Sequence, residues 1–240
     1  MSDPVQRRWI DIGPGYAGYL ALPPAGRGPG ILLMQEIFGV NEHIRAVADQ
    51  YALDGFVVLA PDLFWRQAPR VELGYEGADI TQGRALMTAY TAEQAIADIG
   101  AAARTLRARA EVGTSKVGGS GEARIGALGY CMGGRMAWFA AATAGVDAAV
   151  PYYGGGIHLH LHHAATVRCP VQFHFAGHDD HIPPEAVAAV RQAMGPDRAE
   201  MHVYADAHHG FNCWARGSYH AASAALAHGR ALSFLAAKLF

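Results

Sequence analysis

The sequence predicts an α/β fold: a mostly parallel central sheet of about eight strands with helices on both faces. Short apolar runs alternate along the chain with longer segments of helical periodicity, a pattern typical of a mainly parallel sheet. The length of 240 residues suits one such domain, which we expect to span residues 1–240. A chain of this size can also bury a sizeable core.

The expected elements follow one another in this order. An opening pair of strands, residues 9–12 and 17–22, flanks a Gly-Pro-Gly turn. Six apolar runs then predict buried strands at residues 31–35, 56–60, 124–129, 148–153, 171–176 and 201–204. Helices are expected at residues 41–53, 85–109, 132–144, 184–194 and 219–240. The last helix has Ala225, Leu232, Leu235 and Leu239 on one face, so we expect it to dock on the sheet.

Two segments lack a clear periodicity of apolar residues. Residues 118–121, Gly-Gly-Ser-Gly, are expected to form a surface turn. Residues 64–84 mix arginine, glycine, proline and aromatic residues after a predicted strand. A long excursion after a strand lies over the carboxyl ends of an open α/β sheet, where ligands bind. We therefore expect a pocket wall or lid there, with a variable surface loop as the alternative.

Charge and composition argue against several classes of partner. A net charge of -2 offers no basic surface for nucleic acid or an anionic membrane. The chain opens without a signal-peptide pattern and has no apolar run long enough to span a membrane, so we expect a cytoplasmic protein. The three cysteines, Cys131, Cys169 and Cys213, argue against a disulfide framework. A small-molecule partner fits best, with a monomer or small homo-oligomer.

Histidines are frequent, with thirteen in the chain, and four of them lie within six residues: His158, His160, His162 and His163. Alternating histidines can bind a metal ion, but no acidic residue or cysteine lies nearby in sequence. We expect these histidines to face solvent in a polar loop, and we expect neither a metal nor an organic cofactor.

The most informative motif is Gly129-x-Cys131-x-Gly133, which ends a strand-like run and leads at once into a helical pattern. This layout is typical of a nucleophile elbow, in which a sharp turn exposes the nucleophile above the sheet and nearby glycines avoid a clash. Serine usually occupies the position, whereas here it is a thiol. A small buried cysteine is the alternative interpretation.

A carboxylate and an imidazole follow at later strand ends. Asp179 comes after the strand at residues 171–176, and His209, followed by Gly210, comes after the strand at residues 201–204. α/β-Hydrolases supply their triad in this chain order of nucleophile, acid and histidine. Asp179 alone could be a turn former or helix cap, and His209 alone a loop histidine. The three together predict a triad.

Most of the chain resembles the dienelactone hydrolase family, the cysteine-dependent branch of the α/β-hydrolases. The resemblance rests on five motifs: Gln35-Glu36-Ile37-Phe38-Gly39-Val40-Asn41, Ala60-Pro61-Asp62-Leu63, Gly129-Tyr130-Cys131-Met132-Gly133-Gly134, Gly177-His178-Asp179 with Pro183, and His209-Gly210-Phe211. It implies an α/β-hydrolase fold with Cys131 as nucleophile, Asp179 as acid and His209 as base. It also implies a fourth member, Glu36, that pairs with the thiol and helps to generate the thiolate when substrate arrives. The alternative for Glu36 is a surface carboxylate.

The elbow also predicts an oxyanion hole. The backbone N–H of Met132 starts the helix, and the N–H of Ile37, after the strand at residues 31–35, would supply the second donor.

The residues expected to bind substrate depart from the family pattern. Dienelactone hydrolases place one arginine before the long helix and another shortly after the catalytic histidine, to hold a substrate carboxylate. Here Cys213 stands at the second position with Arg216 three residues on, and Ile80 or Thr81 stands at the first with Arg84 one helical turn away. Phe38, Trp65, Tyr152 and Trp214 are further candidates for the pocket wall, with core packing as their alternative.

We therefore predict a cysteine-dependent hydrolase of small esters or lactones that works through an acyl-cysteine intermediate, in the manner of carboxymethylenebutenolide hydrolysis. One alternative is a carboxylesterase of the same family acting on an uncharged ester. The other is a relative that binds ligands or senses oxidants through its thiol without hydrolysis.

Overall fold

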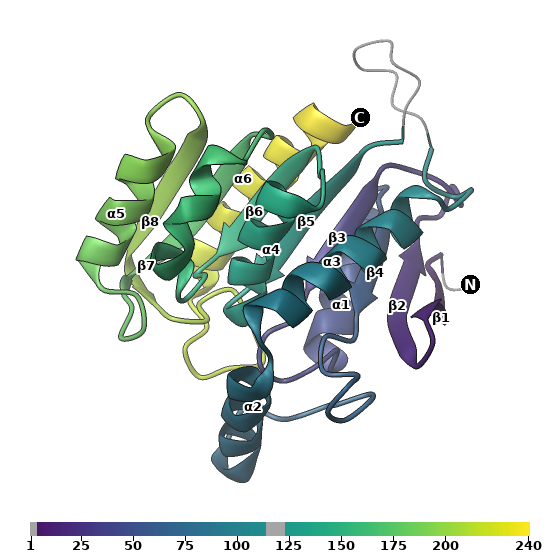
Figure 1. The fold of residues 1–240 in the computed structure, drawn as a ribbon, viewed down its shortest axis with the longest axis horizontal. Coiled ribbons are helices and arrows are strands. Elements are labelled where there is room, and N and C mark those ends of the chain that lie inside the picture. The colour runs from purple at the N-terminus through teal and green to yellow at the C-terminus, as the bar shows by residue number, and fades with distance from the viewer. Residues whose placement is uncertain (1–3, 114–122) are drawn as a thin grey trace.

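One eight-stranded sheet runs through the molecule (Figure 1). The computed structural model describes residues 4–113 and 123–240, so the turn expected at residues 118–121 lies outside the described residues. The strands are β1 (Gln6–Gly13), β2 (Tyr16–Leu22), β3 (Gly30–Met34), β4 (Val57–Pro61), β5 (Ile125–Tyr130), β6 (Ala148–Tyr152), β7 (Val171–His178) and β8 (Ala199–His208). Their order across the sheet is β1-β2-β4-β3-β5-β6-β7-β8. Strand β2 pairs antiparallel with β1 and β4, and the other neighbours are parallel. The predicted fold class is confirmed.

Helices cover both faces of this sheet. They are α1 (Glu42–Leu53), α2 (Gly77–Ala89), α3 (Ala92–Arg107), α4 (Met132–Thr143), the 3-10 helix η1 (Ile157–Ala165), α5 (Pro184–Met194) and α6 (Ala221–Leu239). Figure 1 shows α3, α4 and α5 on the near face, and α1 and α6 behind the sheet. Tyr51 of α1 and His228 of α6 meet there with ring centroids 5.2 Å apart. None of the described helices combines the length and apolar character needed to cross a membrane.

The core lies on both sides of the central strands. Every residue of β3, β4, β5 and β6 is buried, which explains why these strands are continuous apolar runs rather than alternating ones. Helix α6 docks on the sheet as expected, with Leu235 and Leu239 fully buried. Each such leucine contributes about 1.5–3 kcal/mol by burial. Ala225, expected on the same face, is exposed, and Ala224 and Ala227 are buried in its place.

The single helix expected at residues 85–109 is two helices. Helix α2 starts inside the segment expected to be a lid. It ends at Ala89, and α3 begins at Ala92. The break carries a capping box: the Gln94 N–H donates to Thr91 Oγ1 at 3.2 Å, and the Thr91 N–H donates to Gln94 Oε1 at 3.1 Å. These reciprocal bonds satisfy two donors that a helix start would otherwise leave unpaired. The histidine-rich segment, expected to be a loop, forms η1.

Candidate active site

Cys131 occupies a strained turn between β5 and α4. Its backbone has φ 57° and ψ -118°, a left-handed conformation that non-glycine residues seldom adopt. The Cys131 N–H donates to the carbonyl of Tyr152 at 3.1 Å, and the Cys131 carbonyl accepts from the Gly134 N–H at 2.9 Å. A Cβ on Gly133 would overlap the carbonyl of Met34 in the neighbouring strand end, so only glycine fits there. The geometry is that of a nucleophile elbow.

The expected carboxylate and imidazole meet across two strand ends. Asp179 directly follows β7 and His209 directly follows β8. His209 Nδ1 lies 2.9 Å from Asp179 Oδ2 and 3.1 Å from Oδ1. The Asp179 side chain is only 1% exposed, and its Oδ1 also accepts from the His181 N–H at 2.9 Å. The carboxylate therefore holds the ring with Nδ1 as donor and leaves Nε2 free to exchange protons.

His209 couples Asp179 to Cys131. Burial alone disfavours the imidazolium, but the negative charge of an ionised Cys131 and the hydrogen bond to Asp179 outweigh burial and raise the pKa of His209 to about 10. The imidazole is therefore a strong partner for the thiol proton. Tyr153, fully buried at the end of β6, supports the ring from the core side, with centroids 5.1 Å apart.

Glu36 lies beneath the site, after β3, and its side chain is 1% exposed. Its Oε1 accepts a hydrogen bond from Arg216 Nη1 at 3.1 Å, and its carboxylate also contacts the Cys213 thiol. Burial raises the pKa of Glu36, while Arg216, His209 and Cys213 oppose that rise. The surface-carboxylate alternative for Glu36 is therefore wrong: this is a buried carboxylate held by a guanidinium.

A cavity of about 580 Å³ opens at the carboxyl ends of the parallel strands. Its wall contains the expected nucleophile and base, both expected oxyanion donors and both expected arginines, together with one expected aromatic residue: Cys131, His209, Ile37, Met132, Arg84, Arg216 and Phe38. Helix α2 projects from this end of the sheet in Figure 1 and contributes Arg84 and Ile80. The expectation that residues 64–84 contain pocket wall thus holds for the part that begins α2.

Three expected aromatic residues lie elsewhere. Trp65 stacks on Tyr16 of β2 at 5.3 Å, under the guanidinium of Arg66. Tyr152 is fully buried in the sheet and stacks on His174 at 4.3 Å. Trp214 is 46% exposed and packs against His43 at 4.2 Å, beside a separate hollow of about 460 Å³. Each ring has an aromatic partner outside the cavity and is absent from the cavity wall, so the expectation that these three residues line the pocket is wrong.

Sequence reasoning missed several residues of the wall: Met87, Thr88, Arg135, Gly155, Gly156 and His181. Arg135 lies in the first turn of α4, four residues after Cys131, a position that turns back toward the elbow. His181 lies two residues after Asp179 and meets the His209 ring at 4.8 Å. Both could have been found from their spacing to a triad member.

The chain is similar to known proteins over most of its length. The family model of the dienelactone hydrolase family matches residues 16–239. A carboxymethylenebutenolidase of Pseudomonas putida is 32% identical over 223 residues, which cover 92% of this chain and 91% of that protein. A carboxymethylenebutenolidase of Pseudomonas sp. strain P51 is 34% identical over 199 residues, covering 82% of this chain and 79% of that protein.

Solved structures share the fold. A crystal structure from Klebsiella pneumoniae superposes with a TM-score of 0.81 at 29% identity and covers 97% of this chain and 98% of that one. The dienelactone hydrolase of Anabaena variabilis gives a TM-score of 0.69 at 18% identity, covering 99% of this chain and all of the other. The family-model match spans nearly the whole chain and contains the positions of every motif that carries the site. The chain therefore belongs to the dienelactone hydrolase family of carboxylic ester hydrolases.

Proposed function

We propose that this hydrolase cleaves small esters or lactones that carry a carboxylate, with Cys131 as the nucleophile and an acyl-cysteine intermediate. The single observation that carries the proposal is the position of Cys131 on a strained elbow, in one cavity with a histidine that a buried carboxylate orients. This arrangement serves nucleophilic acyl transfer. The fold by itself gives no reason for a cysteine with positive φ at this position.

Acylation starts with the thiol proton. His209 Nε2 accepts it while Asp179 holds Nδ1, and Cys131 Sγ attacks the carbonyl carbon of the bound ester. The oxyanion that forms is stabilised by the N–H groups of Met132 and Ile37, both in the cavity wall. The N–H of Met132 has no partner inside α4, because the first N–H groups of a helix point outward from its start.

The tetrahedral intermediate then collapses to the acyl-enzyme, and water hydrolyses the acyl-enzyme. The carbon–oxygen bond of the ester or lactone breaks, and the departing oxygen takes the proton from His209. Water next attacks the thioester as His209 accepts its proton, and the carbon–sulfur bond breaks to release the acid. The proton held by His209 returns to Cys131, which restores the resting site.

Three guanidinium groups in the cavity wall support an anionic substrate. Arg84, Arg135 and Arg216 come from three separate elements, and none of the described wall residues carries a carboxylate. A guanidinium binds a carboxylate through two parallel N–H donors, a stronger contact than a neutral hydrogen bond. Arg216 already holds Glu36, so a substrate carboxylate would compete with Glu36 for that group. Such competition would free Glu36 to assist ionisation of the thiol.

An uncharged ester remains the second candidate, because Phe38, Ile80 and Met87 give the same cavity an apolar wall. Rates for a lactone with a free carboxylate and for its methyl ester separate the two. We expect the carboxylate to be preferred by about tenfold or more, since one charge-assisted hydrogen bond contributes about 1.5–3 kcal/mol. Equal rates would favour the neutral substrate.

The role of Cys131 is tested with two variants. Cys131→Ala should reduce turnover of both substrates to the uncatalysed rate. Intact-protein mass spectrometry of the quenched wild type should show one acyl adduct, and mass spectrometry after digestion should place it on the peptide that contains Cys131. The matched control is Cys169→Ala, which removes a half-buried thiol outside the cavity wall and should keep full activity. Undiminished turnover by Cys131→Ala would refute the mechanism, and a non-hydrolytic thiol sensor would show no turnover in either protein.

A further inference from the structure

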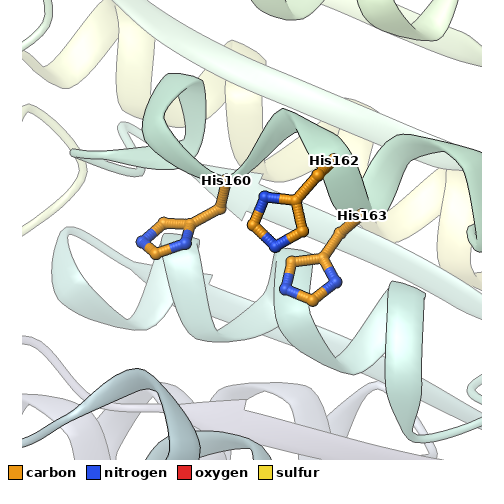
Figure 2. A group of neighbouring side chains, drawn as sticks. All are labelled: His160, His162 and His163. Atoms are coloured by element: carbon orange, nitrogen blue, oxygen red, sulfur yellow. The ribbon is translucent and has the colours of Figure 1, made fainter.

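Three histidines of η1 form a cluster outside the active-site cavity. His160, His162 and His163 each offer a ring nitrogen, and these ligand atoms all lie within 4.8 Å of one another. Figure 2 shows the three rings gathered beside η1. Within the part of the chain that the structure describes, this is the one group of three or more histidine, cysteine or acidic side chains with that spacing.

A backbone irregularity helps to bring the rings together. His160 has φ -125° and ψ 30°, outside the helical region, so η1 is kinked at the first histidine of the cluster. In a regular helix residues i and i+2 do not face one another, so the pair His160 and His162 would otherwise diverge. Here their ring centroids are 6.1 Å apart, and those of His162 and His163 are 4.2 Å apart.

The kinked segment is held by its neighbours before any ligand binds. Trp138 Nε1 of α4 donates to the His160 carbonyl at 3.3 Å, and Arg198 Nη1 donates to the Ala164 carbonyl at 2.9 Å. Phe139, the next residue of α4, meets the rings of His160 and His163 edge-on at 5.0 and 5.6 Å. These contacts hold the backbone and orient two of the three rings, so a ligand has only small side-chain adjustments to impose.

The ring nitrogens are also chemically available. Among the hydrogen bonds of the described residues, none uses a ring nitrogen of these three histidines. Neutral imidazoles with free lone pairs are the form that a metal ion binds.

We propose that His160, His162 and His163 form a binding site for a divalent transition-metal ion of the zinc, nickel and copper class. Imidazole nitrogens select these ions, whereas calcium and magnesium require oxygen ligands, which this cluster lacks. Zinc binds histidine nitrogen at about 2.0–2.1 Å, which puts tetrahedral ligands about 3.3 Å apart. Small rotations about the side-chain torsions close the difference from the present spacing.

The site is open and lies at the surface. His162 is exposed, so water completes the coordination of an ion held by three protein ligands. The guanidinium of Arg135 lies close enough to interact with His160 and repels a cation, so we expect weaker binding than in closed thiolate sites. The same guanidinium belongs to the active-site wall, which places the cluster next to that cavity without sharing its catalytic groups.

The test is a titration of metal-free protein with Zn²⁺ by calorimetry. It is done in a Cys131→Ala background, because a reactive thiol paired with histidine is itself a zinc ligand set. We expect one equivalent of Zn²⁺ to bind, and we expect Ca²⁺ and Mg²⁺ to give no heat of binding. His160→Ala and His163→Ala should each weaken binding by about tenfold or more. The matched control is His158→Ala, a histidine of the same helix outside the cluster.

A second measurement reports the ligands directly. Electron paramagnetic resonance of bound Cu²⁺ should show hyperfine coupling to three nitrogens in the parent, and fewer in His163→Ala. The proposal is overturned if zinc binds equally well to the parent and to the His160→Ala/His163→Ala double variant, or if the parent binds no zinc at millimolar concentration. Circular dichroism of each variant distinguishes a lost ligand from a lost fold.

Discussion

Replacing Arg216 by alanine is expected to leave the carboxylate of Glu36 buried without its charged partner. The Glu36 side chain is 1% exposed, and its second oxygen, Oε2, has no hydrogen-bond partner among the described residues. The Cys213 thiol would remain beside it, but a thiol is a weak donor. The variant must therefore either bury a charge or take up a proton.

The size of the effect follows from burial. Removing one partner of a buried ion pair costs about 3–5 kcal/mol, and the lower end applies here because the Arg216 side chain is still 21% exposed. With a urea m value of about 3 kcal/mol/M for a chain of this size, a loss of about 3 kcal/mol moves the unfolding midpoint down by about 1 M.

The loss should depend on pH in a defined direction. Burial already raises the pKa of Glu36 in the folded protein, and Arg216 opposes that rise, so the variant's Glu36 has a still higher pKa. An acid with a raised folded pKa binds its proton more tightly when folded. The free energy of unfolding therefore falls as pH rises from the unfolded pKa through the folded one. We expect a small defect near pH 5 and the full defect near pH 8.

The assay is urea unfolding followed by tryptophan fluorescence at both pH values, for the wild type, Arg216→Ala and the double variant Glu36→Gln/Arg216→Ala. The double variant should recover at least half of the stability lost at pH 8, since the neutral amide removes the uncompensated charge. A defect of equal size at both pH values, with no recovery in the double variant, would mean that Glu36 and Arg216 are not energetically coupled.

The remaining predictions concern catalysis. Asp179→Asn should lower kcat for an activated small ester by about 10³ to 10⁴, because a neutral amide can donate to Nδ1 and so favours the wrong tautomer of His209. A decline under tenfold in initial-rate assays would count against His209 as the base. Arg84→Met should raise KM for a carboxylate-bearing lactone by about tenfold, the equivalent of one charge-assisted hydrogen bond, and leave the neutral methyl ester unaffected. Equal KM changes for both substrates would rule out an anion contact. Glu36→Gln should reduce turnover and shift the pH profile of iodoacetamide alkylation at Cys131, and coincident profiles would show that Glu36 does not tune the thiol.

The strands and the three principal site residues could be predicted because their signals are local. A strand buried on both faces is a continuous apolar run, as in β3 and β5. The glycines around Cys131 mark a turn that larger residues cannot form. Asp179 and His209 follow strand ends, and parallel strands bring their carboxyl ends to one edge of the sheet.

The direction of an aromatic side chain at the end of a strand could not be predicted from local sequence, because it depends on residues distant along the chain. Tyr152 and Tyr153 are consecutive, yet the first stacks on His174 within the sheet and the second meets His209. Which neighbour each ring finds depends on residues brought in by β7 and β8, far along the chain. Trp65 and Trp214 likewise pack on partners that only the fold supplies.

The missed boundary between α2 and α3 has another cause. Thr91 and Gln94 form a recognisable capping signal, but it lies in a run of good helix formers that continues on both sides. The kink in η1 is harder still to foresee, since a run of alternating histidines has no period that identifies a helix.

Arg216 illustrates how a group can reach a site from a different sequence position. The family resemblance places an arginine at Cys213, three residues earlier, where this chain has a fully buried thiol. After His209 the chain coils through successive turns: the Cys213 N–H donates to the Gly210 carbonyl at 3.0 Å, and the Arg216 N–H donates to the Cys213 carbonyl at 3.1 Å. Coiling returns the side chain at position 216 to the strand ends.

Gly210 keeps the path of that side chain open. It has φ 82°, and a Cβ there would lie 2.5 Å from Arg216 Nη1. The glycine after His209 therefore serves two purposes, since it lets the chain turn and it lets the guanidinium pass over the turn to Glu36. Because recognition of an anion depends on where the guanidinium ends and not on which residue carries it, cysteine at position 213 is no argument against a carboxylate-bearing substrate.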